Sequence, residues 1–175
     1  MKKLFFCLVA IVATLACSNA QKKGFSDGSM SKKLTTLENT QISFQEILKK
    51  HAGKVTVIEV WASWCSDCVK AMPKVKDMQA KNPEVDYVFI SMDKEFEKWK
   101  IGIEKHELKG DHYWATDGMK GEFGKSIDLD WIPRYIIIGK NGEVLLYRAI
   151  ETDFDKINKQ LKTAVYRRAG STKAE

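Results

Sequence analysis

Residues 54–68 read Lys-Val-Thr-Val-Ile-Glu-Val-Trp-Ala-Ser-Trp-Cys-Ser-Asp-Cys. Residues 54–61 are rich in β-branched and apolar side chains, which predicts a central strand buried on both faces. From Ser66 onward, apolar side chains recur at every third position as far as Met78, which predicts a helix. The stretch therefore places two cysteines where a buried strand passes into a helix.

Periodicity, capping residues and turn signals predict further elements on both sides of this stretch. We expect a short helix capped by Ser43 and Glu46, a strand over 85–92, a helix over 94–106, a short strand at 113–115, a short helix over 119–127, strands over 135–138 and 143–147, and a last helix that begins after Thr152. Asn141-Gly142 separates two of these strands and predicts an antiparallel hairpin. The order of elements predicts an α/β fold in which a central mixed β-sheet is flanked by helices on both faces.

The N-terminus has the order of a secretory signal peptide: two lysines, an apolar run over 4–16, and then small residues up to Ala20. The run is shorter than the roughly 18 residues of a membrane-spanning helix, which favours export. Cleavage after Ala20 would release a soluble protein, whereas lipoprotein processing would place a lipid anchor on Cys17. We expect a signal peptide over 1–20 and a periplasmic protein, or a membrane-anchored lipoprotein that faces the periplasm.

The rest of the chain is long enough for one domain. We assign residues 21–41, which are polar and lack periodicity, to a linker or N-terminal extension, residues 42–168 to the domain, and residues 169–175 to a flexible basic tail. The formal net charge is +6, and the lysines are scattered rather than clustered. This pattern indicates a solvated basic surface and excludes nucleic acid as a partner. We expect a monomer.

Cys65 and Cys68 are the two cysteines that remain after a soluble export. A structural disulfide would gain little from closing so short a loop, because the entropic stabilisation grows with loop length. A zinc site would need two further ligands, and the three histidines of the chain lack a suitable spacing. The pair therefore indicates thiol-disulfide chemistry, and we expect no metal and no cofactor.

The sequence resembles the thioredoxin-like superfamily at several separate motifs. Residues 61–68 are similar to the thioredoxin active-site segment, and Pro73 lies where that family kinks its helix. Ile132-Pro133 and residues 140–144 resemble its cis-proline strand and hairpin. The long insertion between Met92 and Trp131, together with the signal peptide, most resembles the exported TlpA-like branch, whose members reduce extracytoplasmic disulfides. The resemblance implies a thioredoxin fold.

Position and resemblance together suggest catalytic roles. Cys65 would lie at the N-terminus of a helix, where backbone N–H groups and the helix dipole favour a thiolate, so we predict it as the attacking sulfur. Cys68, one turn later, is the predicted resolving sulfur. By analogy with thioredoxins, Glu59 would take the proton of Cys68, with a pKa raised by burial. The alternative for Glu59 is a strand-edge or ion-paired carboxylate.

The resemblance also implies a substrate-binding surface. Pro133 would be a cis-proline facing the disulfide, and the backbone of Ile132 would pair with an extended substrate segment. We assign Trp64 and Trp131 to the same surface, with a place in the core as the alternative for Trp131. Arg134 would make the substrate groove more basic than in thioredoxin.

Ser66-Asp67 replaces the Gly-Pro of thioredoxin and places a potential negative charge between the two sulfurs. The direction of electron flow is therefore open. We expect an exported thiol-disulfide oxidoreductase. The leading hypothesis is a reductase of protein disulfides that receives electrons from a membrane or periplasmic donor. The alternatives are a disulfide oxidase or isomerase, and a non-catalytic binding module on the same scaffold.

Overall fold

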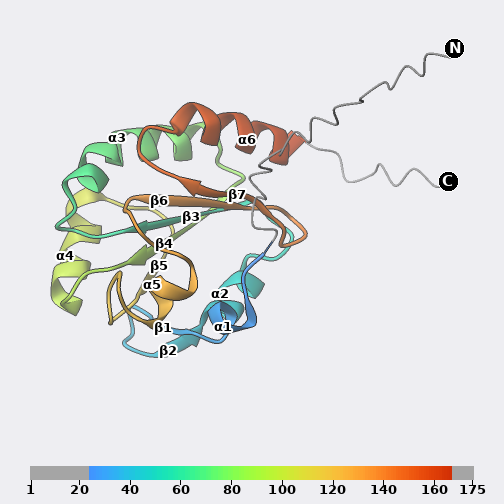
Figure 1. Cartoon of the computed structure of the whole chain (residues 1–175). Helices are drawn as coiled ribbons and strands as arrows, with labels where there is room; N and C mark the ends of the chain where they lie inside the picture. Colours follow the sequence, from blue (N-terminus) through green and yellow to red (C-terminus); the bar gives the residue numbers. More distant parts are fainter. Residues whose placement is uncertain (1–23, 167–175) are drawn as a thin grey trace, which may run out of the picture.

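The computed structural model describes residues 24–166, which form seven strands and six helices (Figure 1). In chain order they are α1 (Asp27–Met30), β1 (Lys33–Thr35), β2 (Gln41–Ser43), α2 (Phe44–Lys50), β3 (Thr56–Trp61), α3 (Ser66–Lys81), β4 (Asp86–Ser91), α4 (Phe96–His106), β5 (Asp111–Trp114), α5 (Glu122–Ser126), β6 (Arg134–Ile138), β7 (Val144–Ala149) and α6 (Phe154–Tyr166). The predicted signal peptide over 1–20, Cys17 and the tail over 169–175 lie outside the described residues.

All seven strands form one mixed sheet in the order β2-β1-β5-β4-β3-β6-β7. Strand β3 pairs in parallel with β4, and β4 in parallel with β5. Strand β6 runs antiparallel to β3 on its other side, and β7 runs antiparallel to β6. The strand that leads to the cysteines is therefore central, and every residue of β3 is buried as its apolar run predicts.

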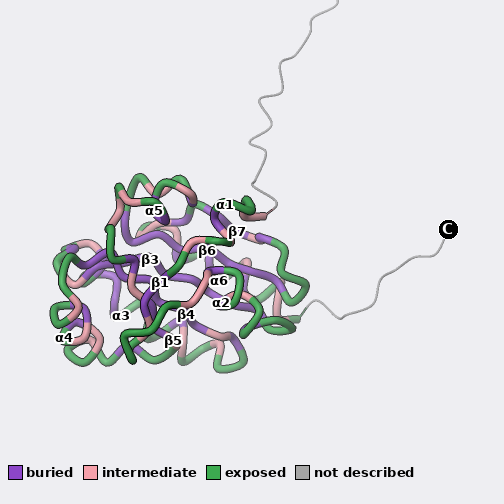
Figure 2. Tube along the Cα trace, turned by 90° about the horizontal axis from the view of Figure 1, so that it is seen from below, coloured by how far each residue is buried: buried purple, intermediate pink, exposed green. Residues whose placement is uncertain are grey.

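Helices cover both faces of the sheet, as predicted. Figure 1 shows α3 and α6 together on one side and α1, α2 and α5 on the other. The central strands β3, β4 and β6 are almost entirely buried, while many residues of the connecting loops are exposed (Figure 2). Within residues 24–166, no helix has the length and apolar character needed to cross a membrane.

Local signals read from the sequence have their expected effect. Ser43 and Glu46 form the predicted capping box: the Ser43 Oγ accepts from the Glu46 N–H at 3.2 Å, and the Ser43 N–H donates to the Glu46 carboxylate at 2.8 Å. Gly142 has a φ of 82°, the left-handed value that the β6–β7 turn requires. Pro73 lies inside α3.

Of the two predictions for residues 21–41, a linker and an N-terminal extension, the linker is wrong for the described part, which is an extension that adds strands to the sheet. Residues 24–41 contain α1 and β1 and reach the start of β2, and these two strands form one edge of the sheet. Strand β1 pairs with β2 through three residue pairs and with β5 through Thr35 and Trp114. Leu34 is buried. Strands of three residues are too short to show periodicity, so only pairing with β5 reveals them.

Candidate active site

The two cysteines lie where β3 ends and α3 begins, at the centre of the sheet. A turn over residues 62–65 joins the two elements, and the Cys65 N–H donates to the Ala62 carbonyl at 3.1 Å. Cys65 is the N-cap residue of α3, and its carbonyl accepts from the Val69 N–H at 3.0 Å. The predicted strand and helix are therefore both present, and the turn between them places Cys65 at a helix N-terminus.

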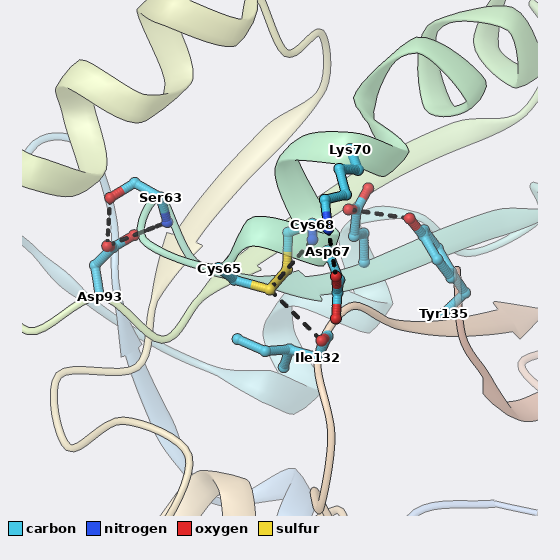
Figure 3. The surroundings of a disulfide bond; sticks show 9 residues. Ser63, Cys65, Asp67, Cys68, Lys70, Asp93, Ile132 and Tyr135 are labelled. Atoms are coloured by element: carbon cyan, nitrogen blue, oxygen red, sulfur yellow. Dashed lines mark hydrogen bonds and ion pairs between the residues drawn. A yellow bond between two sulfur atoms is a disulfide. The ribbon is translucent and has the colours of Figure 1, made fainter. Parts of the chain in front are cut away.

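Cys65 and Cys68 form a disulfide (Figure 3). Cys68 is fully buried, whereas 7% of Cys65 is exposed. Cys65 is therefore the more accessible of the two. An incoming thiol or disulfide reaches Cys65 first.

The N-terminus of α3 supplies a hydrogen bond to Cys65. The Cys68 N–H donates to the Cys65 Sγ at 3.2 Å. After reduction, this donor and the positive end of the helix dipole favour a negatively charged sulfur at Cys65. Cys68 lies inside the first turn, where its own sulfur is buried and has no such helix-end position.

The peptide bond between Ile132 and Pro133 is cis, as the family resemblance implied. Both residues are buried, and the Ile132 carbonyl oxygen lies 3.5 Å from the Cys65 sulfur. Figure 3 shows this carbonyl pointing toward the disulfide from the loop before β6. The structure therefore brings together Cys65, Cys68, Ile132 and Pro133 from two distant parts of the chain.

Two tryptophans next to these residues are exposed. Trp64 precedes Cys65 and is 57% exposed, and Trp131 precedes Ile132 and is 50% exposed. The alternative of a core position for Trp131 is therefore wrong. Large exposed aromatic side chains are common anchors of protein interfaces.

Glu59 lies in the middle of β3 and is 2% exposed. It is opposite Tyr135 in the β3–β6 pairing, and the Tyr135 hydroxyl donates to the Glu59 Oε1 at 3.3 Å. Among residues 24–166, the Oε2 atom has no hydrogen-bond partner. Burial raises the pKa of Glu59 to about 8, although the Tyr135 hydrogen bond opposes that rise. Glu59 is not at a strand edge, because β3 lies between β4 and β6, and no residue within 24–166 forms an ion pair with it. Tyr135 is among the residues that surround the disulfide (Figure 3).

The negative charge of Asp67, which lies between the two cysteines in sequence, is partly balanced by Lys70. Asp67 lies in the first turn of α3, and its carboxylate is 3.5 Å from the Lys70 Nζ. The Asp67 side chain is 34% exposed and that of Lys70 77%. An exposed pair of this kind is worth less than about 1 kcal/mol. A carboxylate at this place also interacts favourably with the helix dipole.

Arg134 does not make the substrate groove basic, contrary to the expectation from sequence. Its side chain is 2% exposed and forms an ion pair with Asp130. Asp130 also pairs with Arg148 on β7. Arg134 thus ties the loop before the cis-proline to the sheet. The sequence does not tell whether the side chain of Arg134 points into the substrate groove or into the protein interior.

Asp93 is a residue near the site that the sequence analysis missed. It follows β4, is 1% exposed, and accepts hydrogen bonds from the backbone and side chain of Ser63. Its position after a predicted buried strand could have indicated it, because the carboxyl ends of parallel strands meet at one edge of the sheet, where functional sites gather.

Within residues 24–166, no group of three or more His, Cys, Asp or Glu side chains is arranged to hold a metal ion.

The family model described as thioredoxin-like matches residues 53–144. The chain belongs to the thioredoxin-like family. It is 25% identical over 131 residues to the thiol-disulfide oxidoreductase ResA of Bacillus thuringiensis, a match that covers 74% of this chain and 72% of that protein. A shorter match of 54 residues, 33% identical, links it to a thioredoxin of Geodia cydonium and covers 31% of this chain and 51% of that one. The protein is a thiol-disulfide oxidoreductase, as the cysteine pair and the TlpA-like resemblance predicted.

Solved structures confirm the thioredoxin fold. One is a secreted Mycobacterium tuberculosis disulfide oxidoreductase homologous to E. coli DsbE, with a TM-score of 0.61 and 18% identity, where the match covers 79% of this chain and 99% of the other. Another is the thioredoxin domain of a Bacteroides vulgatus thiol-disulfide oxidoreductase, with a TM-score of 0.61, 19% identity and the same coverage of 79% and 99%.

Proposed function

We propose that this protein is an exported reductase of protein disulfides, with Cys65 as the attacking sulfur and Cys68 as the resolving sulfur. The observation that carries the proposal is the Cys65–Cys68 disulfide at the N-terminus of α3, with the Ile132 carbonyl 3.5 Å from the Cys65 sulfur. A redox pair, a helix end that favours a thiolate and a backbone edge for a substrate then meet at one place.

In the first step, the Cys65 thiolate attacks one sulfur of a substrate disulfide. A bond forms between Cys65 and that sulfur, the substrate S–S bond breaks, and the other substrate sulfur leaves as a thiolate. The Cys68 N–H, 3.2 Å from the Cys65 sulfur, stabilises the thiolate before the attack.

In the second step, Cys68 loses its proton and attacks Cys65 in the mixed disulfide. The enzyme disulfide forms, and the substrate leaves with both of its sulfurs reduced, so two electrons pass from enzyme to substrate. We assign the uptake of the Cys68 proton to Glu59. Burial raises the pKa of Glu59 to about 8, so an ionised Glu59 is a stronger base for the Cys68 proton than an ordinary carboxylate.

The substrate would bind as an extended segment beside the cis-proline. The backbone of Ile132 would pair with the substrate backbone, and Pro133 would hold the Ile132 carbonyl toward Cys65. Trp64 and Trp131 would contact apolar side chains of the substrate on either side of the disulfide, since both are at least half exposed.

The enzyme disulfide must be reduced again before a second turnover, which requires a dithiol donor at the membrane or in the periplasm. Export is supported by the signal-peptide pattern over 1–20, with Cys17 as a possible lipid anchor. Mass spectrometry of the mature N-terminus distinguishes cleavage after Ala20 from lipidation of Cys17.

The test combines two variants with a potential. Cys65→Ala should abolish insulin reduction, and Cys68→Ala should accumulate a mixed disulfide with the substrate. Full activity of both variants would refute the mechanism. The reduction potential of the pair then decides direction, because a value near −270 mV, roughly that of thioredoxin, means a reductant, and one near −120 mV, roughly that of strong periplasmic oxidants, means an oxidase.

A further inference from the structure

The turn over residues 62–65 determines where the Cys65 sulfur lies. The Cys65 N–H closes this turn on the Ala62 carbonyl at 3.1 Å, and α3 begins at the next residue. A shift of the turn would therefore move the Cys65 sulfur relative to the Cys68 N–H, 3.2 Å away, and the Ile132 carbonyl.

Asp93 holds the second residue of this turn. Its two carboxylate oxygens lie 3.2 and 3.0 Å from the Ser63 N–H nitrogen, and the Ser63 hydroxyl donates to Oδ1 at 2.7 Å. Figure 3 shows Asp93 and Ser63 facing each other on one side of the disulfide. A carboxylate that is 1% exposed is stable in such a place only with hydrogen bonds of this kind.

Asp93 is in turn anchored to the sheet. The Ser91 hydroxyl donates to Asp93 Oδ2 at 2.7 Å and accepts from the Asp93 N–H at 2.9 Å. Ser91 is the last residue of β4 and lies opposite Trp61, the last residue of β3. The Trp114 indole N–H, from β5, donates to the Asp93 carbonyl at 2.7 Å. Residues of β4 and β5 thus fix Asp93, whose carboxylate holds the turn.

Helix α4 closes the turn from another direction. A Cβ atom added at Gly102 would lie 2.8 Å from the Ser63 Cβ and 3.1 Å from Cη2 of Trp61. The helix backbone therefore packs directly on Ser63, an approach that a larger residue would prevent. Ser63 is held by Asp93 through hydrogen bonds and by α4 through contact.

We propose that Asp93 is a positioning residue for the attacking sulfur: by holding Ser63, it keeps Cys65 against the Cys68 N–H at the start of α3. Asp93 acts through geometry rather than through its charge. This inference rests on Cys65 as the attacking sulfur but not on the direction in which the enzyme works.

Position and charge predict opposite effects, which makes the inference testable. Loss of the carboxylate charge alone would lower the pKa of Cys65, because a nearby negative charge disfavours a thiolate. Loss of position would raise that pKa, because the Cys68 N–H would no longer face the sulfur. Asp93→Asn removes the charge but keeps an oxygen that accepts from Ser63, whereas Asp93→Ala removes both.

The experiment measures the rate at which iodoacetamide alkylates Cys65 in the reduced full chain between pH 4 and 10, roughly the range that brackets thiol titration. Mass spectrometry of peptides resolves Cys65 from the other cysteines. We expect Asp93→Ala to lower the thiolate fraction of Cys65 at neutral pH by about tenfold, the loss of one hydrogen bond to a charged group. Asp93→Asn should leave the fraction unchanged or higher. Fast alkylation at Cys68 instead of Cys65 in the unaltered protein would refute the assigned nucleophile and, with it, this inference. Fast alkylation at Cys65 that Asp93→Ala leaves unchanged would refute the inference alone.

Ser63→Ala provides a second test if Asp93→Ala does not fold. It removes the hydroxyl hydrogen bond but leaves the backbone N–H in place, so we expect a smaller decrease in the same direction. Ser29→Ala is the matched control, because it removes a buried serine hydroxyl that donates at 2.7 Å to the Ser126 carbonyl, in the α1–α5 region. The inference is wrong if Asp93→Ala and Asp93→Asn change Cys65 alike, or if Ser63→Ala behaves as Ser29→Ala does.

Discussion

Replacement of Glu59 by glutamine should make the protein more stable at high pH. Glu59 is 2% exposed, and burial raises its pKa from an ordinary value of 4.5 to about 8. Because the folded state binds this proton more tightly than the unfolded state, the stability contributed by Glu59 is fully present below about pH 4.5 and is lost as the pH rises toward 8. Glutamine cannot ionise and does not suffer this loss.

The size of the effect follows from the two pKa values. One pKa unit corresponds to about 1.4 kcal/mol. At pH 7 the unfolded state is ionised at Glu59 while the folded state keeps the proton, so the protein is about 3 kcal/mol less stable than it is at low pH, and the loss reaches about 5 kcal/mol well above pH 8. The glutamine amide retains an oxygen that accepts from the Tyr135 hydroxyl, as Glu59 Oε1 does at 3.3 Å. The variant and the unaltered protein should therefore have similar stability near pH 5.

The assay is denaturant unfolding of the oxidised protein at several pH values between 5 and 9. The free energy of unfolding of Glu59→Gln should exceed that of the unaltered protein by an amount that grows by about 3 to 4 kcal/mol between pH 5 and 8. Glu104→Gln is the control, because Glu104 is exposed on α4 and the same substitution should leave the two curves parallel. Parallel curves for Glu59→Gln would refute the burial argument and, with it, the pKa on which the role of Glu59 as a base depends.

Three further substitutions test separate parts of the site. Tyr135→Phe removes the hydrogen bond that lowers the pKa of Glu59, so the loss of stability should continue to a higher pH than in the unaltered protein; a loss that ends at the same pH would contradict the contact. Trp131→Ala should raise KM for a protein disulfide about fivefold, roughly 1 kcal/mol, and leave the rate with a small disulfide unchanged, whereas equal effects on both would exclude a substrate contact. Gly102→Ala should destabilise the protein by about 1–3 kcal/mol through its clash with Ser63 and should slow alkylation of Cys65. Unaltered stability would contradict the tight packing of α4 on Ser63.

The central part of the fold was readable from sequence because its signals are strong and local. The buried strand before the cysteines, the capping box at Ser43 and the Asn141-Gly142 turn each follow from side-chain chemistry within a few residues. The edge strands β1 and β2 were not readable, because three residues carry too little pattern. They pair with each other, but they join the sheet through β5, where Thr35 pairs with Trp114, 79 residues later in the chain.

For the site, the sequence by itself determined the redox pair, the asymmetry between its two sulfurs and, through resemblance, the cis bond before Pro133. The spacing of residues along a strand and a helix is local, so it can be interpreted without knowledge of the fold. Only the tertiary structure decided that Arg134 is buried on Asp130, that Trp131 is exposed, and that Asp93 holds the turn before Cys65. Those facts depend on which side chains from distant segments meet and how much water they exclude, and no spacing along one segment encodes either quantity.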